Sequence, residues 1–379
     1  MGLFSSEPAA RVCGIAIDDY GLRISTMSCE DRTLSSPADG EFVGMLDGPA
    51  TARARGIDET LTALAGRTVP LLEAEDRDAM GRSASARDGY ADRLAELFDE
   101  IDDDGWDGET VVAMPPDYAD SSALELQGVV EDSGFDVRQV VTHDAASSVL
   151  GAVDHEINTD ASGSHPIVTV DLGLRAVTVT LASVNLDEGR VRVRARDSVD
   201  AGLVDLLGHT AVNAIEDSRL TPDEVTLEME TGLYPAIRQI FDPYTDSARG
   251  EIEVGGETMP VTVSTEHFIG LFADVASFAE MAATEFVVEA GYVPREVDRV
   301  LISGLGSEGD SGGDLTAQIA ARFTSEDSMA AEVGAGYAPE SVYYGNEMMP
   351  DVGAADVARE AHALGRDLDM LETLDVEAT

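Results

Sequence analysis

Lysine is absent from this 379-residue chain. All 24 basic residues are arginine, against 74 Asp and Glu, and the formal net charge is −50. Without lysine the chain cannot carry out Schiff-base chemistry or form a P-loop, whose lysine reaches the β- and γ-phosphates. It also has no basic patch. DNA affinity depends on Lys and Arg contacts to phosphates, so direct nucleic-acid binding is not expected.

Cysteines and long apolar runs are also scarce. Cys13 and Cys29 are the only cysteines, and both are expected in strands as buried free thiols rather than as a disulfide. No apolar run reaches the roughly 18 residues of a membrane span. The N-terminus lacks the apolar core of a signal peptide. We therefore expect a cytoplasmic protein without a transmembrane segment.

The acidity itself indicates the solvent rather than a partner. With 44% hydrophobic residues the chain is expected to fold, and its length suffices for two domains. In about 1 M salt the Debye length is about 3 Å, so surface carboxylates hardly repel one another. In about 0.1 M salt repulsion should loosen the fold. This composition is typical of proteins in a haloarchaeal cytoplasm.

Two stretches predict β-hairpins with acidic turns. Residues 165–184 read HPIVTVDLGLRAVTVTLASV, in which Asp171-Leu172-Gly173 separates two apolar runs. Glycine lets backbone N–H groups approach an anion, and a carboxylate can hold a hydrated cation beside it. Residues 11–29 show the same pattern around Asp18, Asp19 and Gly21. Taken alone, each stretch fits an ordinary hairpin as well as a phosphate site.

The segments around these hairpins indicate an α/β protein. Residues 110–153 follow a βαβα pattern, which is typical of a mostly parallel sheet covered by helices. Residues 155–165 form a polar connector and a candidate domain boundary. Residues 190–198 predict a third strand, with Arg alternating on one face as in a solvated edge strand. Asp197 lies near the end of this strand.

The second half of the chain predicts further helices and a glycine-rich loop. Helices are expected over 202–218, 225–242 and 266–291, and a hairpin turns at Gly255-Gly256. Residues 298–323 read as strand, glycine-rich loop and helix, a pattern that fits a nucleotide contact or a surface loop.

The C-terminal segment is predicted to be helical. A helix is expected to begin behind Pro339 within residues 337–348, and an acidic amphipathic helix is expected over the tail, 352–379.

Taken in order, these pieces resemble the actin-like ATPase superfamily, which includes actins, DnaK-type chaperones and sugar kinases. VVAMPPDYADSSALELQGVVEDSGFDVRQVV is similar to the strand, turn and helix of the family. THDAASSVLGAV and APESVYYGNEM resemble its two connecting helices, and VLISGLG resembles its adenosine loop. The resemblance runs from about residue 12 to about residue 350. It implies an α/β fold of two domains, each a mixed sheet flanked by helices, with a nucleotide cleft between them.

The resemblance also implies domain boundaries. Domain I would comprise residues 11–160 and 332–371, and domain II residues 165–331. Residues 1–10 and 372–379 would be terminal tails.

The family's functional positions can be carried over to this chain as expectations. ATP or ADP with Mg²⁺ would bind between the hairpins, and Asp18, Asp171 and Asp197 would hold the cation largely through water. The catalytic candidates are Asp171 and the residue that positions the attacking water, either His143 or Asp144. The remaining expected nucleotide contacts are Asp19, Gly21, Leu172, Gly173, Arg175, Gly202, Arg238, Gly304, Leu305 and Gly306.

The second hairpin departs from the family pattern. Leu174 and Arg175 replace a glycine and a small residue. We expect Arg175 to supply the phosphate-neutralising charge that a family lysine often gives.

Several functions remain open within this resemblance. The favoured one is an ATP-hydrolysing actin homologue, similar to haloarchaeal actin homologues. Its slow hydrolysis would be coupled to assembly with copies of itself into cytoskeletal filaments. A DnaK-like chaperone is less favoured, because no peptide-binding domain follows the core in these 379 residues. A non-dynamic actin-like adaptor and a sugar kinase are further alternatives. The cellular cargo is not readable from the sequence.

Overall fold

A computed structural model gives the fold of the chain. It describes residues 10–17, 21–35, 43–44, 75–77, 83–85, 91, 94–99, 101, 106, 108–116, 118, 120–218, 220, 225–240, 245–304, 315–333, 336–344 and 350–372.

The strands that build the sheets are β1 (Arg11–Ile17), β2 (Gly21–Ser28), β3 (Leu34–Ser35), β4 (Val43–Gly44), β5 (Glu75–Arg77), β6 (Ser83–Ser85), β7 (Glu109–Met114), β8 (Asp136–Thr142), β9 (His165–Leu172), β10 (Val177–Asn185), β11 (Arg190–Val199), β12 (Ser247–Val254), β13 (Glu257–Ser264), β14 (Arg299–Gly304), β15 (Val342–Tyr344) and β16 (Asp369–Glu372). The helices are α3 (Asp120–Asp132), α4 (His143–Thr159), α5 (Leu203–Asp217), α6 (Leu227–Gly232), α7 (Tyr234–Gln239), α8 (Thr265–Glu289), α9 (Leu315–Phe323), α10 (Met329–Glu332) and α11 (Pro350–Leu364), with 3₁₀ turns at Pro294–Glu296 and Pro339–Ser341.

The two large sheets share one topology. The first runs β3-β2-β1-β7-β8, and the second contains the same order as β11-β10-β9-β14-β15. The directions match as well. In each sheet the first three strands of the chain pair antiparallel and the last two add in parallel. This is an internal structural repeat. It confirms the predicted α/β class with mixed sheets flanked by helices.

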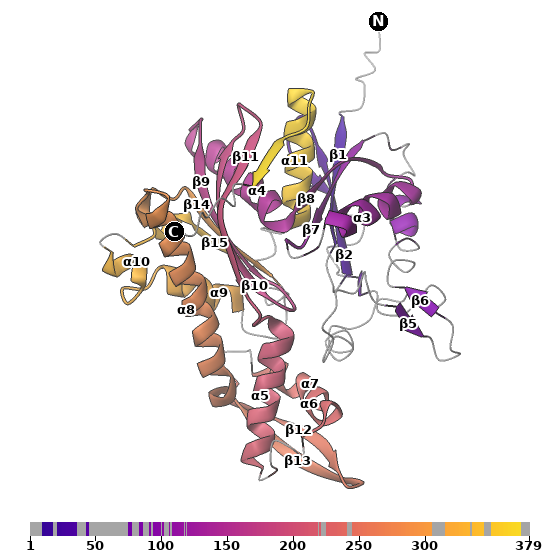
Figure 1. Ribbon diagram of the computed structural model, residues 1–379, viewed down its shortest axis with the longest axis vertical. Helices are drawn as coiled ribbons and strands as arrows, with labels where there is room; N and C mark the ends of the chain where they lie inside the picture. The colour runs from indigo at the N-terminus through magenta and orange to yellow at the C-terminus, as the bar shows by residue number, and fades with distance from the viewer. Residues whose placement is uncertain are drawn as a thin grey trace, which may run out of the picture.

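Helices α4 and α11 lie between the two sheets, as Figure 1 shows. Each follows the last parallel strand of one sheet, and each packs against strands of the other. A single apolar cluster joins both sheets through these helices, from Val12 and Val111 on the first sheet to Ile167 and Val184 on the second. The packing between the sheets is therefore part of the core.

Small residues allow this close packing. A Cβ atom on Gly14 of β1 would lie 2.0 Å from the carbonyl oxygen of Asp351 in α11. One on Gly353 of α11 would lie 2.4 Å from the carbonyl oxygen of Ala146 in α4. Helix α11 thus touches both β1 and α4 through backbone, and larger side chains would push these elements apart.

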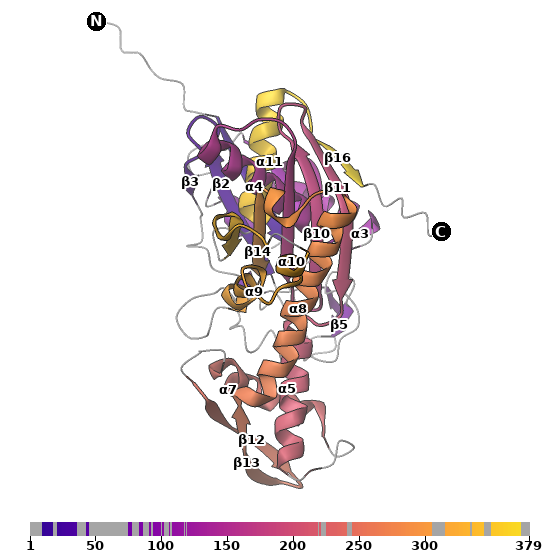
Figure 2. The same cartoon turned by 90° about the vertical axis from the view of Figure 1, so that its left-hand side faces the viewer.

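A separate unit extends from the second sheet. Figures 1 and 2 show α5, α6, α7 and the β12–β13 hairpin at the far end of the molecule, with α8 running from this unit back to the sheet. The predicted turn at Gly255-Gly256 is confirmed, because both glycines adopt positive φ between the paired strands. The predicted single helix over 225–242 is wrong, since the chain breaks into α6 and α7 at Leu233.

The C-terminal segment differs from its prediction. Instead of starting a helix behind Pro339, the chain makes a 3₁₀ turn and strand β15, which pairs with β14 in the second sheet. The helix begins at Pro350, and α11 is largely buried rather than an acidic surface tail. Strand β16 then pairs with β11. Small residues, which carry a weak apolar signal, are what fit this helix between two sheets.

Strand β11 is not the solvated edge strand that was predicted. Its first half is paired on both sides, with β10 and β16. Its Arg residues do not share one face either, because a bulge interrupts the alternation. Among the described residues, no helix is long and apolar enough to cross a membrane.

We predict that Gly14→Ala destabilises the protein by about 3 kcal/mol, because its methyl group must displace the backbone of α11. Gly270→Ala is the matched control. It lies in α8 with open space around its Cβ position, and should stabilise the protein by up to about 1 kcal/mol. Thermal unfolding in molar KCl measures both. Equal stabilities of the two variants would contradict the close packing of α11 on β1.

Candidate functional site

Asp171 stands at the carboxyl end of the second sheet. It lies near the end of β9, opposite Ser303 near the end of the parallel neighbour β14. The Ser303 Oγ lies 3.4 Å from Asp171 Oδ1, and His143 Nδ1 lies 3.9 Å from Asp171 Oδ2. The Asp171 side chain is 22% exposed. The carboxyl ends of parallel strands are where α/β sheets bind ligands, and a carboxylate there suits a hard cation such as Mg²⁺.

The first turn of α4 supplies both residues expected near the attacking water. His143 and Asp144 are buried at the start of this helix. Asp144 Oδ2 accepts hydrogen bonds from Thr180 Oγ1 at 2.8 Å and from Arg196 Nε at 2.8 Å, and it lies 2.7 Å from Arg196 Nη2. His143 therefore faces Asp171, whereas Asp144 is held against the strands of the second sheet.

The internal repeat places an equivalent contact at α11. Asp144 is the second residue of α4, and Asp351 is the second residue of α11. Ser25 Oγ of β2 donates to Asp351 Oδ2 at 2.5 Å, as Thr180 of β10 donates to Asp144. An aspartate thus hydrogen-bonds each central helix to a strand of the sheet that the helix packs against: α4 to β10 and α11 to β2.

The same register sets the position of Asp171 in the repeat. The last strand pair before the turn is Ile17↔Leu22 in the first hairpin and Leu172↔Val177 in the second, and both turns have the same length. Ile17 and Leu172 are therefore equivalent in the repeat, and the residues before them, Ala16 and Asp171, are equivalent too. The hairpins were predicted to carry equivalent carboxylates at Asp18 and Asp171. In register, however, Asp18 lies two residues beyond the matching position. Asp18 and Asp19 fall outside the described residues, and Gly21 is the first residue of β2.

The sequence reasoning missed Arg23. It is buried in β2, and alternation along the strand places it on the same face as Ser25, toward α11. It pairs with Ala16, the position that matches Asp171. A single arginine inside the apolar run GLRIS is the one signal that could have marked it, because a buried cation is rare without a specific role.

The turn of the second hairpin is held by α5. The carbonyl oxygens of Gly173, Leu174 and Arg175 accept the N–H groups of Leu203, Val204 and Gly202 at 2.9–3.1 Å. Leu174 is buried in the core. The structure brings Gly202 to the hairpin as expected. The Gly202 N–H already donates to the backbone carbonyl oxygen of Arg175, however, so a phosphate at this turn would need other hydrogen-bond donors.

Arg175 lies in the turn of the second hairpin, next to the start of α5. Burial raises the pKa of Asp205 in the first turn of α5, and the positive charge of Arg175 acts against that shift. Arg175 is half-buried. The predicted contact of Arg175 with a phosphate stays a prediction.

The predicted nucleoside contacts are partly described. Gly304 ends β14 at φ 133°, and a Cβ atom there would lie 2.2 Å from the carbonyl oxygen of Leu172. The position thus requires glycine. Leu305 and Gly306 lie outside the described residues. Arg238 lies in α7, which packs on α5 and β12 in the distal unit of Figure 1.

The structure does not bring Asp197 together with Asp171. Asp171 pairs with Thr178 and Asp197 with Val179, so the two side chains belong to opposite faces of the second sheet. Val179 belongs to the core under α5 and α8, whereas Thr180 on the other face contacts α4. Asp197 is exposed. A cation held by Asp171 would therefore take its other ligands from elsewhere.

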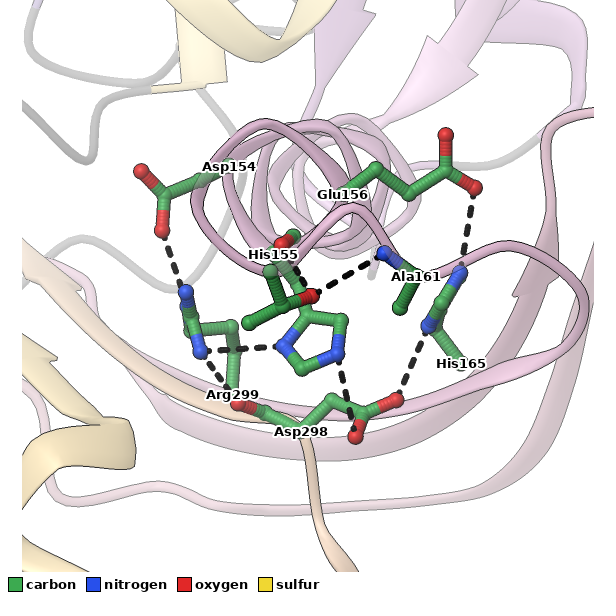
Figure 3. Close-up of polar contacts among 8 residues, drawn as sticks. Asp154, His155, Glu156, Ala161, His165, Asp298 and Arg299 are labelled. Atoms are coloured by element: carbon green, nitrogen blue, oxygen red, sulfur yellow. Dashed lines mark hydrogen bonds and ion pairs between the residues drawn. The ribbon is translucent and has the colours of Figure 1, made fainter.

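A second polar cluster lies at the opposite end of α4, where Figure 3 shows two histidines around one aspartate. His165 Nδ1 lies 2.9 Å from Asp298 Oδ2, and His165 Nε2 lies 3.0 Å from Glu156 Oε1. His155 Nε2 lies 3.5 Å from Asp298 Oδ1. The donor atoms of these two histidines and Asp298 are close enough to surround one ion.

Arg299 gives this cluster a structural role, holding the end of α4 to β9 and β14, rather than that of a metal centre. Its guanidinium contacts Asp154 Oδ2 at 2.8 Å and His155 Nδ1 at 3.1 Å. A guanidinium only donates, so His155 Nδ1 must accept and Nε2 carries the proton of the neutral ring. Burial lowers the pKa of His155, which favours this neutral form. A metal on Nε2 would leave Nδ1–H facing the guanidinium, the reverse of a normal outer shell.

No protein-family model matches the chain, and no curated protein is significantly similar to it. The chemistry of the site therefore rests on its own residues. Asp171 offers oxygen ligands for a cation, and the α4 N-terminus and the hairpin turn offer positive potential for phosphate.

Proposed function

We propose that this protein binds Mg²⁺ and ATP between its two sheets and hydrolyses ATP slowly, as an actin-like ATPase. The observation that carries the proposal is the repeat. Two sheets of one topology are joined by two central helices, and an aspartate-bearing hairpin of the second sheet lies beside the N-terminus of α4. A ligand at the ends of these sheets beside the central helices fits this arrangement, and the order of motifs in the sequence supports the same interpretation.

In this proposal the residues around Asp171 form the phosphate end of the site. Asp171 would hold the cation through water, and Arg175 and Arg23 would compensate the phosphate charge from the two hairpins. Gly304 would allow the nucleoside to lie close to the end of β14. Bound magnesium would supply charge stabilisation for phosphoryl transfer, a reaction that depends mainly on positioning and electrostatics.

We further propose that the protein assembles into nucleotide-regulated filaments with copies of itself, in a high-salt cytoplasm. This step rests on the resemblance to actin homologues and on a salt-adapted composition with a net charge of −50. A DnaK-like chaperone ATPase and a non-dynamic actin-like adaptor are the alternatives.

The first test compares two aspartates of one sheet. Asp171→Asn should weaken Mg-ATP binding about tenfold to hundredfold, because a charge-assisted contact is worth about 1.5–3 kcal/mol. Asp197→Asn, a matched change on the opposite face, should leave binding within about twofold. Isothermal titration in molar KCl measures both affinities. Wild-type affinity in Asp171→Asn would remove this hairpin from the site.

A second test addresses the cations. Arg175→Ala and Arg23→Ala should each lower ATP affinity about tenfold, because the first removes a positive charge from the turn of the β9–β10 hairpin and the second removes one from β2 of the β1–β2 hairpin. Arg192→Ala, in β11, is the control and should bind ATP normally. Unchanged affinity in either hairpin variant would show that its arginine does not contact the nucleotide.

The third test addresses assembly. Wild-type protein in molar KCl should sediment in the presence of Mg-ATP and remain in the supernatant with Mg-ADP, because ATP is expected to favour the filament contact. Electron micrographs of the pellet should show filaments. A protein that binds ATP but never sediments would favour the adaptor, and ATP-dependent release of unfolded peptide would favour the chaperone.

A further inference from the structure

Arginine 196 reaches its position through a β-bulge. Strand β11 pairs with β10 as Leu181↔Ala195 and then Ala182↔Val193, which leaves Arg194 as the extra residue. Side chains alternate along a strand, so one inserted residue reverses the faces that follow it. Arg196 therefore shares the face of Thr180 and Ala182, the face that α4 covers.

On that face Arg196 makes a nearly buried ion pair. Its side chain is 13% exposed, and that of its partner Asp144 is 2% exposed. Nε and Nη2 both lie within 2.8 Å of Asp144 Oδ2, and Nη2 lies 3.4 Å from Thr142 Oγ1 on the residue that precedes α4. The guanidinium thus contacts both the N-cap residue and the first turn of the helix.

The bonds to Asp144 are one-sided. Thr180 Oγ1 and the Nε and Nη2 atoms of Arg196 all contact Asp144 Oδ2. Asp144 Oδ1 is buried and has no hydrogen-bond partner among the described residues. A buried carboxylate oxygen without a partner calls for a ligand or a water molecule. The adjacent residue of the same turn, His143, faces Asp171. Arg196 consequently fixes the orientation of the helix turn that borders the candidate site.

The internal repeat emphasises this feature. The equivalent aspartate, Asp351, accepts a hydrogen bond from Ser25, and its Oδ1 likewise has no partner among the described residues. Both helices thus share a hydroxyl–aspartate hydrogen bond, from Thr180 to Asp144 and from Ser25 to Asp351. The arginine is an addition at the end of α4 that borders Asp171.

We infer that Arg196 is a positioning residue for ATP hydrolysis: by holding Asp144 against the second sheet, it fixes the first turn of α4 and so aligns His143 on the attacking water. The inference rests on the proposed ATPase function. In the reaction the water oxygen bonds to the γ-phosphorus while the bond from that phosphorus to the β–γ bridging oxygen breaks. The electron pair leaves with ADP, and the protons of the water end on inorganic phosphate and solvent. Arg196 touches neither reactant and acts through the first turn of α4.

The test separates binding from turnover. Arg196→Ala should keep the Kd for Mg-ATP within about threefold and lower kcat at least tenfold, because small misplacements of an orienting group reduce rates by up to about 100-fold. Arg196→Lys retains the charge and the fold but lacks the planar fork, and should give an intermediate kcat. Arg194→Ala, at the exposed bulge residue, is the control and should match the wild type. Titration calorimetry and phosphate release in molar KCl give Kd and kcat.

Each outcome has a defined meaning. Wild-type kcat in Arg196→Ala or in Arg196→Lys, with ATP still bound, would overturn the inference but not the ATPase. If Arg196→Ala unfolds, the lysine variant decides, and a fall in kcat with unchanged Kd and melting temperature supports the role. If the variant binds ATP more weakly and melts at a lower temperature while kcat is unchanged, the ion pair is purely structural. Absence of ATP binding by the wild type would overturn the proposed function and this inference together.

Discussion

The contact between the N-terminal turns of α4 and α11 determines how the two sheets are held. The helices approach so closely at Ala146 and Gly353 that no side chain fits between them. Buried aspartates in the same turns bind a hydroxyl on the second strand of the opposite sheet. Each buried carboxylate would be costly without a partner. Their hydrogen bonds therefore fix the register between helix and strand, which apolar packing alone leaves adjustable.

This arrangement also sets where chemistry can occur. The end of α4 that is pinned by Asp144 is the end that borders Asp171, Ser303 and the turn of the β9–β10 hairpin. The other end of α4 is tied by the cluster of His165, Asp298 and Arg299. The helix is thus held at both ends, and its N-terminal end is the one that borders Asp171. A helix held at both ends can keep the polar side chains of its first turn in place with little loss of entropy on binding.

Much of the fold could be predicted from the sequence, because alternating apolar runs and turn residues gave the hairpins and the βαβα unit. A helix was predicted over the C-terminal tail, but its burial between the sheets, and the strand β16 that follows it, were missed. Ala and Gly dominate PDVGAADVAREAHAL, and such residues read as a weak surface helix although they are what close packing needs. The faces of β11 were also misjudged, since the bulge at Arg194 follows from tertiary pairing and not from the local pattern. For the site, the structure places His143 beside Asp171, whereas Asp197, which was expected to share a cation with Asp171, lies on the opposite face of the sheet.

The most direct measurement is an experimental structure of the protein with Mg²⁺ and a non-hydrolysable ATP analogue in molar KCl. We expect the triphosphate between the turn of the β1–β2 hairpin and the turn of the β9–β10 hairpin, with the metal nearest Asp171 and the γ-phosphate nearest the first turn of α4. A nucleotide bound away from Asp171, or held by one hairpin with the other turned elsewhere, would contradict the central claim.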